Sequence, residues 1–149
     1  MTRSIILASL VFCVGTSVAE EGQTALLAGG KADPKQFNFK VTRADVINTP
    51  AWQPASATPP LSPQRASEIA QKQLEQFVLD RTKWRLHEIS LIDFGEHHWV
   101  YVVHFTRQYP PDLAVTFGDY FEIPVLMSGA VSKPKVIRLR PDRIERIPK

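Results

Sequence analysis

Residues 62–78, SPQRASEIAQKQLEQFV, decide the fold class because they carry the clearest amphipathic pattern in the chain. Ser62 is a residue type that caps the first free amides of a helix, and Pro63 fits the first helical position. Residues then recur at steps of three and four along one face, with one polar member. This face consists of Ala66, Ile69, Ala70, Gln73, Leu74, Phe77 and Val78. The pattern predicts a helix that ends near residues 80–82.

The segments after this helix have the composition and alternation typical of β-strands. Residues 99–105, WVYVVHF, are apolar on both faces and predict a central strand. Residues 86–94, 120–127 and 130–139 predict three more strands, joined by short connections that make sequential strands neighbours. We therefore expect a small α+β domain at residues 62–140, in which one amphipathic helix packs on a four-stranded antiparallel meander.

The segment ahead of this domain, residues 20–61, predicts an extended lead-in. Its first part, residues 20–35, shows little periodicity and is expected to be loose. Beyond it, apolar and polar residues alternate with the period of a strand. The apolar positions of this possible strand are Phe37, Phe39 and Val41.

Residues 48–63 hold five prolines and predict a stiff connector between the lead-in and the helix. Trp52 lies in this connector and is expected to fold back over a hydrophobic edge; a peptide-like ligand is the alternative. Val100 and Val102 lie on the strand face opposite the neighbouring aromatic residues. We expect the lead-in to cover these valines, because an uncovered apolar face marks a partner site.

The N-terminus has the order of regions found in a secretory signal peptide, residues 1–19. Arg3 precedes an apolar run at residues 5–14, and small residues at positions 17 and 19 come just before Glu20. The run is shorter than the roughly 20 residues that span a bilayer. We expect the mature protein to begin at Glu20, to be secreted or periplasmic, and not to be integral to the membrane. A retained N-terminal anchor is the alternative.

Cys13 is the only cysteine in the chain and lies within the signal segment. A lipidated cysteine follows a small residue, whereas Phe12 is large, so we expect no lipidation. The mature chain then has no cysteine for a disulfide, a thiolate metal site or a nucleophile. A secreted domain without disulfides must be held together by its hydrophobic core alone. This property favours a bacterial envelope protein.

The 149-residue chain has a formal net charge of +3, and its cations are concentrated near the C-terminus. Seven basic residues but only two acidic ones lie at or after residue 133. This segment, which includes the basic tail at residues 141–149, can bind anionic lipid, polysaccharide or an acidic protein. The alternative is that its basic residues lie on a solvated strand face. The candidate partner-binding residues are Trp52, Val100, Val102, Lys133, Lys135, Arg138 and Arg140.

The helix and strands together resemble the secreted PepSY-like domains over residues 62–140. The resemblance is carried by ASEIA at 66–70, the strand at 84–92, WVYVV at 99–103 and a strand–turn–strand around Ser128-Gly129. The chain departs from that family in lacking the usual aspartate before the turn and in its proline-rich lead-in. The resemblance implies a helix on a short antiparallel sheet and a role in restraining peptidases or in envelope sensing. A cystatin-like fold is the nearest alternative.

The candidates for metal or acid–base chemistry are the four histidines, His87, His97, His98 and His104. A metal site needs three or four converging ligands. Two of the histidines are adjacent, so on a strand their rings point to opposite faces. The carboxylates that could act as an acid–base pair are Asp112, Asp119 and Glu122. We expect ordinary surface roles for both groups, since no spacing fixes a site.

The chain has no nucleophile elbow, phosphate-binding loop or dinucleotide fingerprint, and we expect no cofactor. It also lacks a dense basic–aromatic array, so we expect no nucleic-acid partner. The sequence therefore predicts an exported, non-catalytic binding or inhibitory module of the bacterial envelope, which restrains a peptidase or scaffolds a protein partner. The alternative is a small extracytoplasmic hydrolase or metal-dependent enzyme that uses the histidines.

Overall fold

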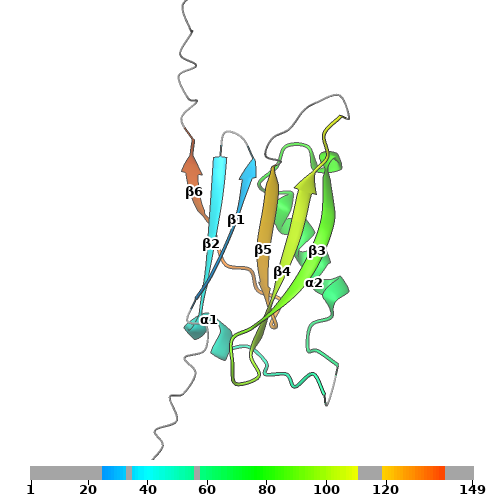
Figure 1. Ribbon diagram of the computed structural model, residues 1–149. Coiled ribbons are helices and arrows are strands. Elements are labelled where there is room, and N and C mark those ends of the chain that lie inside the picture. Colours follow the sequence, from blue (N-terminus) through cyan, green and yellow to red (C-terminus); the bar gives the residue numbers. More distant parts are fainter. Residues whose placement is uncertain (1–24, 33–34, 56–57, 111–118, 140–149) are drawn as a thin grey trace, which may run out of the picture.

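The computed structural model describes residues 25–32, 35–55, 58–110 and 119–139, and it has an α+β fold in which one main helix packs on a six-stranded antiparallel sheet (Figure 1). The strand order is β3-β4-β5-β1-β2-β6. The elements are β1 (Ala25–Ala32), β2 (Lys35–Thr42), α1 (Arg43–Ile47), α2 (Pro63–Leu74), a 3-10 turn η1 (Arg81–Lys83), β3 (Trp84–Asp93), β4 (Trp99–Arg107), β5 (Tyr120–Leu126) and β6 (Lys135–Arg138).

The predicted four-stranded meander is wrong beyond its third strand. β3, β4 and β5 pair in sequence as expected, but β6 pairs with β2, and the β1–β2 hairpin lies between β5 and β6. After the turn at Gly129 the returning chain makes one bridge to β5, between Val131 and Val125. Pro134 then interrupts the run, because proline has no amide proton to donate to a ladder.

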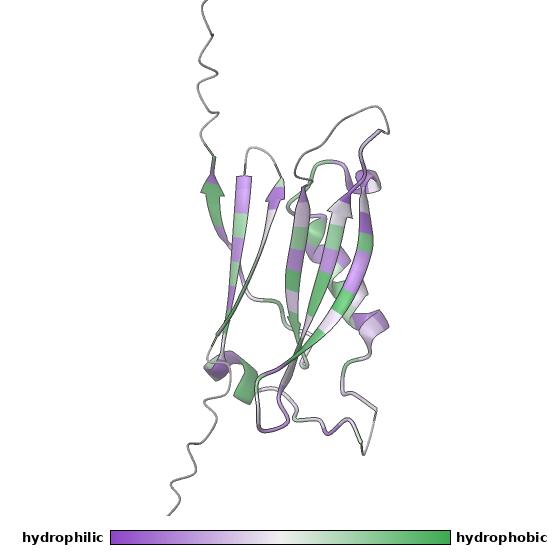
Figure 2. Ribbon diagram, in the orientation of Figure 1, coloured by the Kyte–Doolittle hydropathy of each residue, from purple (hydrophilic) through white to green (hydrophobic). Residues whose placement is uncertain are grey.

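The lead-in predicted at residues 20–61 contributes two strands to the sheet. β2 confirms the strand expected from the alternation of Phe37, Phe39 and Val41, and Figure 2 shows hydrophobic and hydrophilic bands alternating along it. The expectation of a loose segment is wrong for residues 25–32, which form β1. Alanine and glycine in this strand concealed its period.

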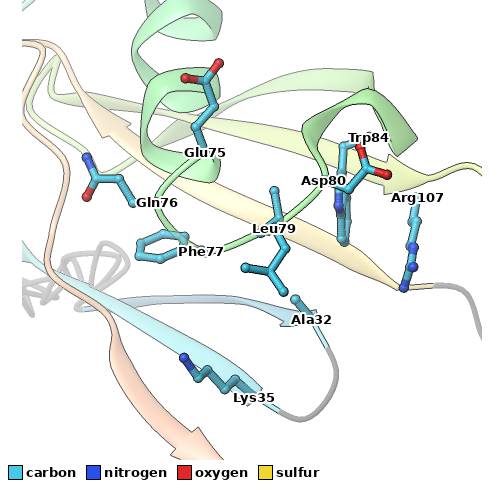
Figure 3. Close-up of a pocket in the computed structure, with 10 residues that line it drawn as sticks. Ala32, Lys35, Glu75, Gln76, Phe77, Leu79, Asp80, Trp84 and Arg107 are labelled. Atoms are coloured by element: carbon cyan, nitrogen blue, oxygen red, sulfur yellow. The ribbon is translucent and has the colours of Figure 1, made fainter.

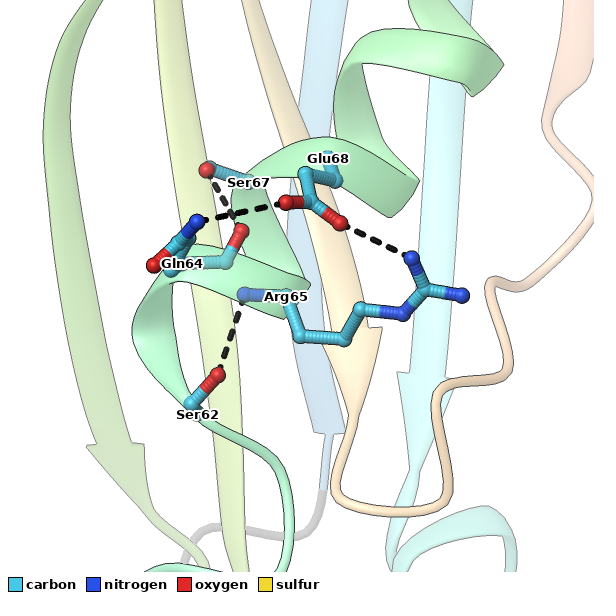
Figure 4. Close-up of polar contacts among 5 residues, drawn as sticks. All are labelled: Ser62, Gln64, Arg65, Ser67 and Glu68. Carbon is cyan, nitrogen blue, oxygen red and sulfur yellow. Dashed lines mark hydrogen bonds and ion pairs between the residues drawn. The ribbon is translucent and has the colours of Figure 1, made fainter.

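The start of α2 is as predicted. The Ser62 hydroxyl accepts a hydrogen bond from the amide of Arg65 at 3.2 Å, and Pro63 occupies the first turn. On the exposed side, the Arg65 guanidinium donates to Glu68 at 2.8 Å and lowers the pKa of that carboxyl (Figure 4). The residues that α2 buries are Ala66, Ala70 and Leu74.

α2 ends at Leu74, earlier than predicted, because the chain tightens there. The amide of Phe77 bonds to the carbonyl of Leu74, three residues back, at 2.9 Å. This turn places the Phe77 ring 4.7 Å from the ring of Phe37 and 6.0 Å from that of Phe121. Phe77 therefore joins the helix end to the β1–β2 hairpin and to β5.

β3 is one edge of the sheet and contains a bulge. Leu86 lies opposite Phe105 and Glu88 opposite His104, so His87 is an extra residue without a partner on β4. Apolar residues before the bulge and after it can thus share the helix-side face despite the odd spacing. Those that pack on the helix-side core or border it are Trp84, Leu86, Ile89 and Leu91.

A second apolar cluster covers the other face of the sheet at one end. Val100 is fully buried there, against Val41 of β2, Val46 of α1 and Phe94. The lead-in therefore covers Val100, as expected, through Val41. Phe37 and Phe39 lie instead in the helix-side cluster.

α1 begins where the amide and hydroxyl of Thr42 both donate to Asp45, which lowers the pKa of that carboxyl.

The proline-rich connector is fixed to the sheet at both of its ends. The Trp99 indole donates to the carbonyl of Trp52 at 2.9 Å, and the Tyr101 hydroxyl donates to that of Leu61 at 3.0 Å. Burial raises the pKa of Tyr101, as expected for a phenol away from water.

Within the described residues, no helix is long and apolar enough to cross a membrane.

Candidate functional site

The predicted partner-binding residues of the connector and of β4 contribute to the core. Trp52 is half-buried and packs edge-to-face on Trp99, with ring centroids 5.8 Å apart. Val100 and Val102 are buried, with 0% and 5% of their surfaces exposed. These valines do not form an exposed apolar patch.

Of the predicted basic residues, Lys133, Lys135 and Arg138 are exposed, the last two on the edge strand β6. Arg140 lies outside the described residues, as do the tail at 141–149, the signal segment at 1–19 and Asp112.

The histidines divide between two places on the β3–β4 hairpin. His97 and His98 lie in or beside its turn, where Glu96 and His97 have positive φ angles of 53° and 65°. His87 lies at the bulge and His104 on β4. In the described part of the chain, no three metal-binding side chains come together as a cation site would need.

His104 belongs to a row of polar side chains across β3, β4 and β5. Its Nδ1 lies 3.5 Å from a Glu122 carboxylate oxygen, and its Nε2 lies 3.5 Å from the Ser90 hydroxyl. These are the residue types of a serine–histidine–acid triad. However, the Ser90 hydroxyl donates to Glu88 at 2.9 Å, so its proton points away from the histidine. The row pairs residues across strands and is not arranged for proton transfer from the serine.

Asp119 does not pair with Glu122 as an acid–base couple. Its carboxylate accepts a hydrogen bond from Arg107 at 2.8 Å, and this bond raises the pKa of Arg107. The Tyr109 ring lies 5.3 Å from the same guanidinium. Asp119 therefore holds the end of β4 to the start of β5.

A partly apolar hollow of about 380 Å³ lies beyond the C-terminal end of α2 (Figure 3). Two of its walls are half-buried aromatic residues, Phe77 just after α2 and Trp84 at the start of β3. Ala32 and Lys35 face them from the β1–β2 hairpin. Leu79 stands at the rim, and its side chain is fully exposed, at 109% of the reference surface. We call this surface the end hollow.

The acidic groups at the rim of the end hollow already have cations. Glu75 pairs with Arg81 at 2.6 Å, and Asp80 pairs with Lys83 at 3.3 Å. The Thr82 hydroxyl donates to Asp80 and is the main cause of its lowered pKa. These carboxylates are bonded within the η1 turn and the helix end, so they shape the rim.

Residues 77–79, Phe-Val-Leu, are the sequence signal for the end hollow. Phe77 and Val78 belong to the expected apolar face of the helix. Leu79 is also apolar, but it does not follow the three- and four-residue spacing of that face. The other walls come from the hairpin and from the end of β4, at Arg107. No local pattern indicates that these three segments meet.

A scan against protein-family models, a search of curated proteins and a search of solved structures each found no match to this chain.

Proposed function

We propose that this protein is a non-catalytic binding module that holds a segment of another protein in the end hollow. The observation that supports this most is the fully exposed Leu79 beside a hollow with half-buried aromatic walls. Ligand sites are typically concave and mostly apolar, with a few polar groups at their edges. An apolar anchor side chain in such a hollow can supply much of the binding energy of an interface.

The rim of the end hollow favours binding over catalysis. Its carboxylates, Glu75 and Asp80, are engaged with cations from neighbouring turns, and Arg107 is engaged with Asp119. A general acid or base must be able to reach the proton of a substrate. Groups fixed in this way instead preserve the shape of the rim.

The proposed setting is the bacterial envelope, where the module restrains a peptidase or scaffolds a partner. The order of regions at residues 1–19 supports export, and the absence of cysteine from the rest of the chain suits a domain held by its core.

The test is partner capture from envelope extract with two matched variants. Leu79→Ser removes the exposed apolar side chain at the end hollow. Leu27→Ser removes one that is 76% exposed on β1. We expect a partner that is retained by the native protein and by Leu27→Ser, and lost with Leu79→Ser. Both variants should unfold at the native temperature, because neither side chain is buried.

Capture of the same proteins at equal yield by Leu79→Ser would show that the end hollow is not the binding site. Equal loss with Leu27→Ser would show that capture depends on general surface hydrophobicity.

A further inference from the structure

We infer that the end hollow binds an acidic segment of its protein partner, with one large apolar side chain between Phe77 and Trp84 and a neighbouring carboxylate beside Lys35 and Arg138. This inference rests on the proposed function and adds the chemistry of the partner to it. It depends on the charges around the hollow, on the apolar surface that continues beyond them and on the composition of this chain's own C-terminal segment.

The first observation is a pair of like charges on adjacent strands. Lys35 of β2 lines the end hollow, and Arg138 of β6 lies directly opposite it in the β2–β6 register. Both side chains are exposed. Within the described ranges, neither forms an ion pair. Like charges directly opposite each other destabilise a sheet, so a bound anion between them would relieve an existing repulsion.

The second observation is that, among the described residues, this pair of cations has no matching carboxylate, whereas the other rim cations do. The other rim cations are matched, Arg81 by Glu75, Lys83 by Asp80, and Arg107 by Asp119. A ligand carboxylate at Lys35 and Arg138 therefore displaces no ion pair among the residues that the structure describes. Opposite charges across an interface set its specificity and the rate of association more than its raw affinity.

Apolar surface continues on both sides of the pair. Val136 of β6 lies opposite Phe37, two residues before Arg138 along the strand, and is 51% exposed. Leu79 is exposed at the other side of the end hollow. A ligand that covers this surface needs apolar groups on either side of its carboxylate, and an extended peptide has this arrangement. The volume of the hollow, about 380 Å³, leaves room for one large side chain.

The sequence after β6 carries more positive than negative charge. It adds four cations and two carboxylates, and the first charged residue after Arg138 is Arg140. Charge complementarity therefore favours a separate acidic segment as the ligand.

The experiment measures binding of labelled peptides by fluorescence anisotropy. The acidic probe has one phenylalanine flanked by two aspartates on each side. A second probe replaces the aspartates with lysines, and a third replaces the phenylalanine with glycine. We expect the acidic probe to bind the native protein at least tenfold more tightly than either of the others.

Two double variants with the same change in net charge test the position of the anion. Lys35→Glu with Arg138→Glu should weaken binding of the acidic probe at least tenfold and strengthen binding of the basic one. Lys40→Glu with Arg85→Glu changes two exposed cations that do not line the end hollow, and it should alter the affinity less than twofold. All four side chains are exposed, so both proteins should fold.

The outcomes separate this inference from the proposed function. If the acidic and basic probes bind equally, and both lose affinity with Leu79→Ser, the end hollow is a binding site but its ligand is not acidic. Equal weakening by the two double variants would also overturn the inference, because it would show general charge attraction. If no probe binds in a way that depends on Leu79, and partner capture does not depend on it either, both proposals are wrong.

Discussion

At the scale of single residues, Gly30 allows β1 to approach β5. A Cβ atom at this position would lie 2.1 Å from the nearest ring atom of Phe121, well inside van der Waals contact. Phe121 is fully buried and lies opposite Gly30 in the one registered pair between the two strands. The glycine therefore serves close packing, which explains why the interpretation of Gly29-Gly30 as part of a loose segment failed.

We predict that Gly30→Ala destabilises the protein by about 1–3 kcal/mol, since the new methyl group must displace the buried Phe121 ring. Chemical denaturation measures the loss. The control is a double-mutant cycle with Phe121→Leu, in which the smaller side chain gives the methyl group room. The cost of Gly30→Ala should then fall markedly; strictly additive effects would show that the ring is not what excludes the methyl group.

At the scale of elements, the bulge in β3 gives one strand two consecutive hydrophobic patterns. Trp84 and Leu86 have one parity, and Ile89 and Leu91 have the other. A regular strand would place these two pairs on opposite faces. Because His87 is an extra residue, the strand changes parity at this point. Both pairs of apolar residues therefore lie on the face of the sheet that carries α2.

We predict that deleting His87 leaves the fold intact, with a loss of stability within about 1 kcal/mol. The shortened strand would alternate regularly and keep all four apolar residues on one face. Deleting Ser90 is the matched control, since it turns Leu91 to the far face and should cost at least about 1.5 kcal/mol. Thermal unfolding of both proteins measures the difference. Equal losses of stability in the two variants would mean that the bulge does not determine which side chains of β3 face α2.

The elements differ in how far the sequence could predict them. The face and the capped start of α2 follow from local spacing, as do the strands around Phe39 and Tyr101. The end of α2 depends on Phe77 reaching Phe37 and Phe121, which are distant in the sequence. The place of β6 beside β2 likewise depends on pairing between residues that are far apart in the sequence, such as Phe37 and Val136.

At the scale of the whole molecule, the first hairpin joins the two parts of the sheet. β1 pairs with β5 on one side of the hairpin, and β2 pairs with β6 on the other. The end hollow shows the same long-range assembly, because its walls come from the hairpin, the end of α2 and the end of β4. The sequence predicted the layers of this molecule, but it could not predict a hollow formed where distant segments meet.

We predict that a chain beginning at Pro50, without β1, β2 and α1, does not fold cooperatively. It would expose Phe77 and Phe121 on one face and Val100 on the other, because their partners in the hairpin and α1 are missing. Dye binding and size-exclusion chromatography should show exposed apolar surface and association. A chain beginning at Ala25 is the control and should unfold as the full chain does. A sharp unfolding transition in the shorter chain would show that the hairpin is not needed for the core.

The pairing of β2 with β6 also affects the time course of folding. Phe37 lies opposite Val136, from almost the other end of the chain, so the sheet is complete only when its last strand has been synthesised. Proteins whose contacts are mostly between residues distant in the sequence fold slowly, in roughly milliseconds to seconds, because chain entropy is lost before the contacts form. In the newly made hairpin, Phe37 and Phe39 also lack the rings of Phe77 and Phe121 that they contact in the folded protein. We therefore expect the nascent polypeptide, unlike the finished molecule with both rings buried, to be a substrate for chaperones.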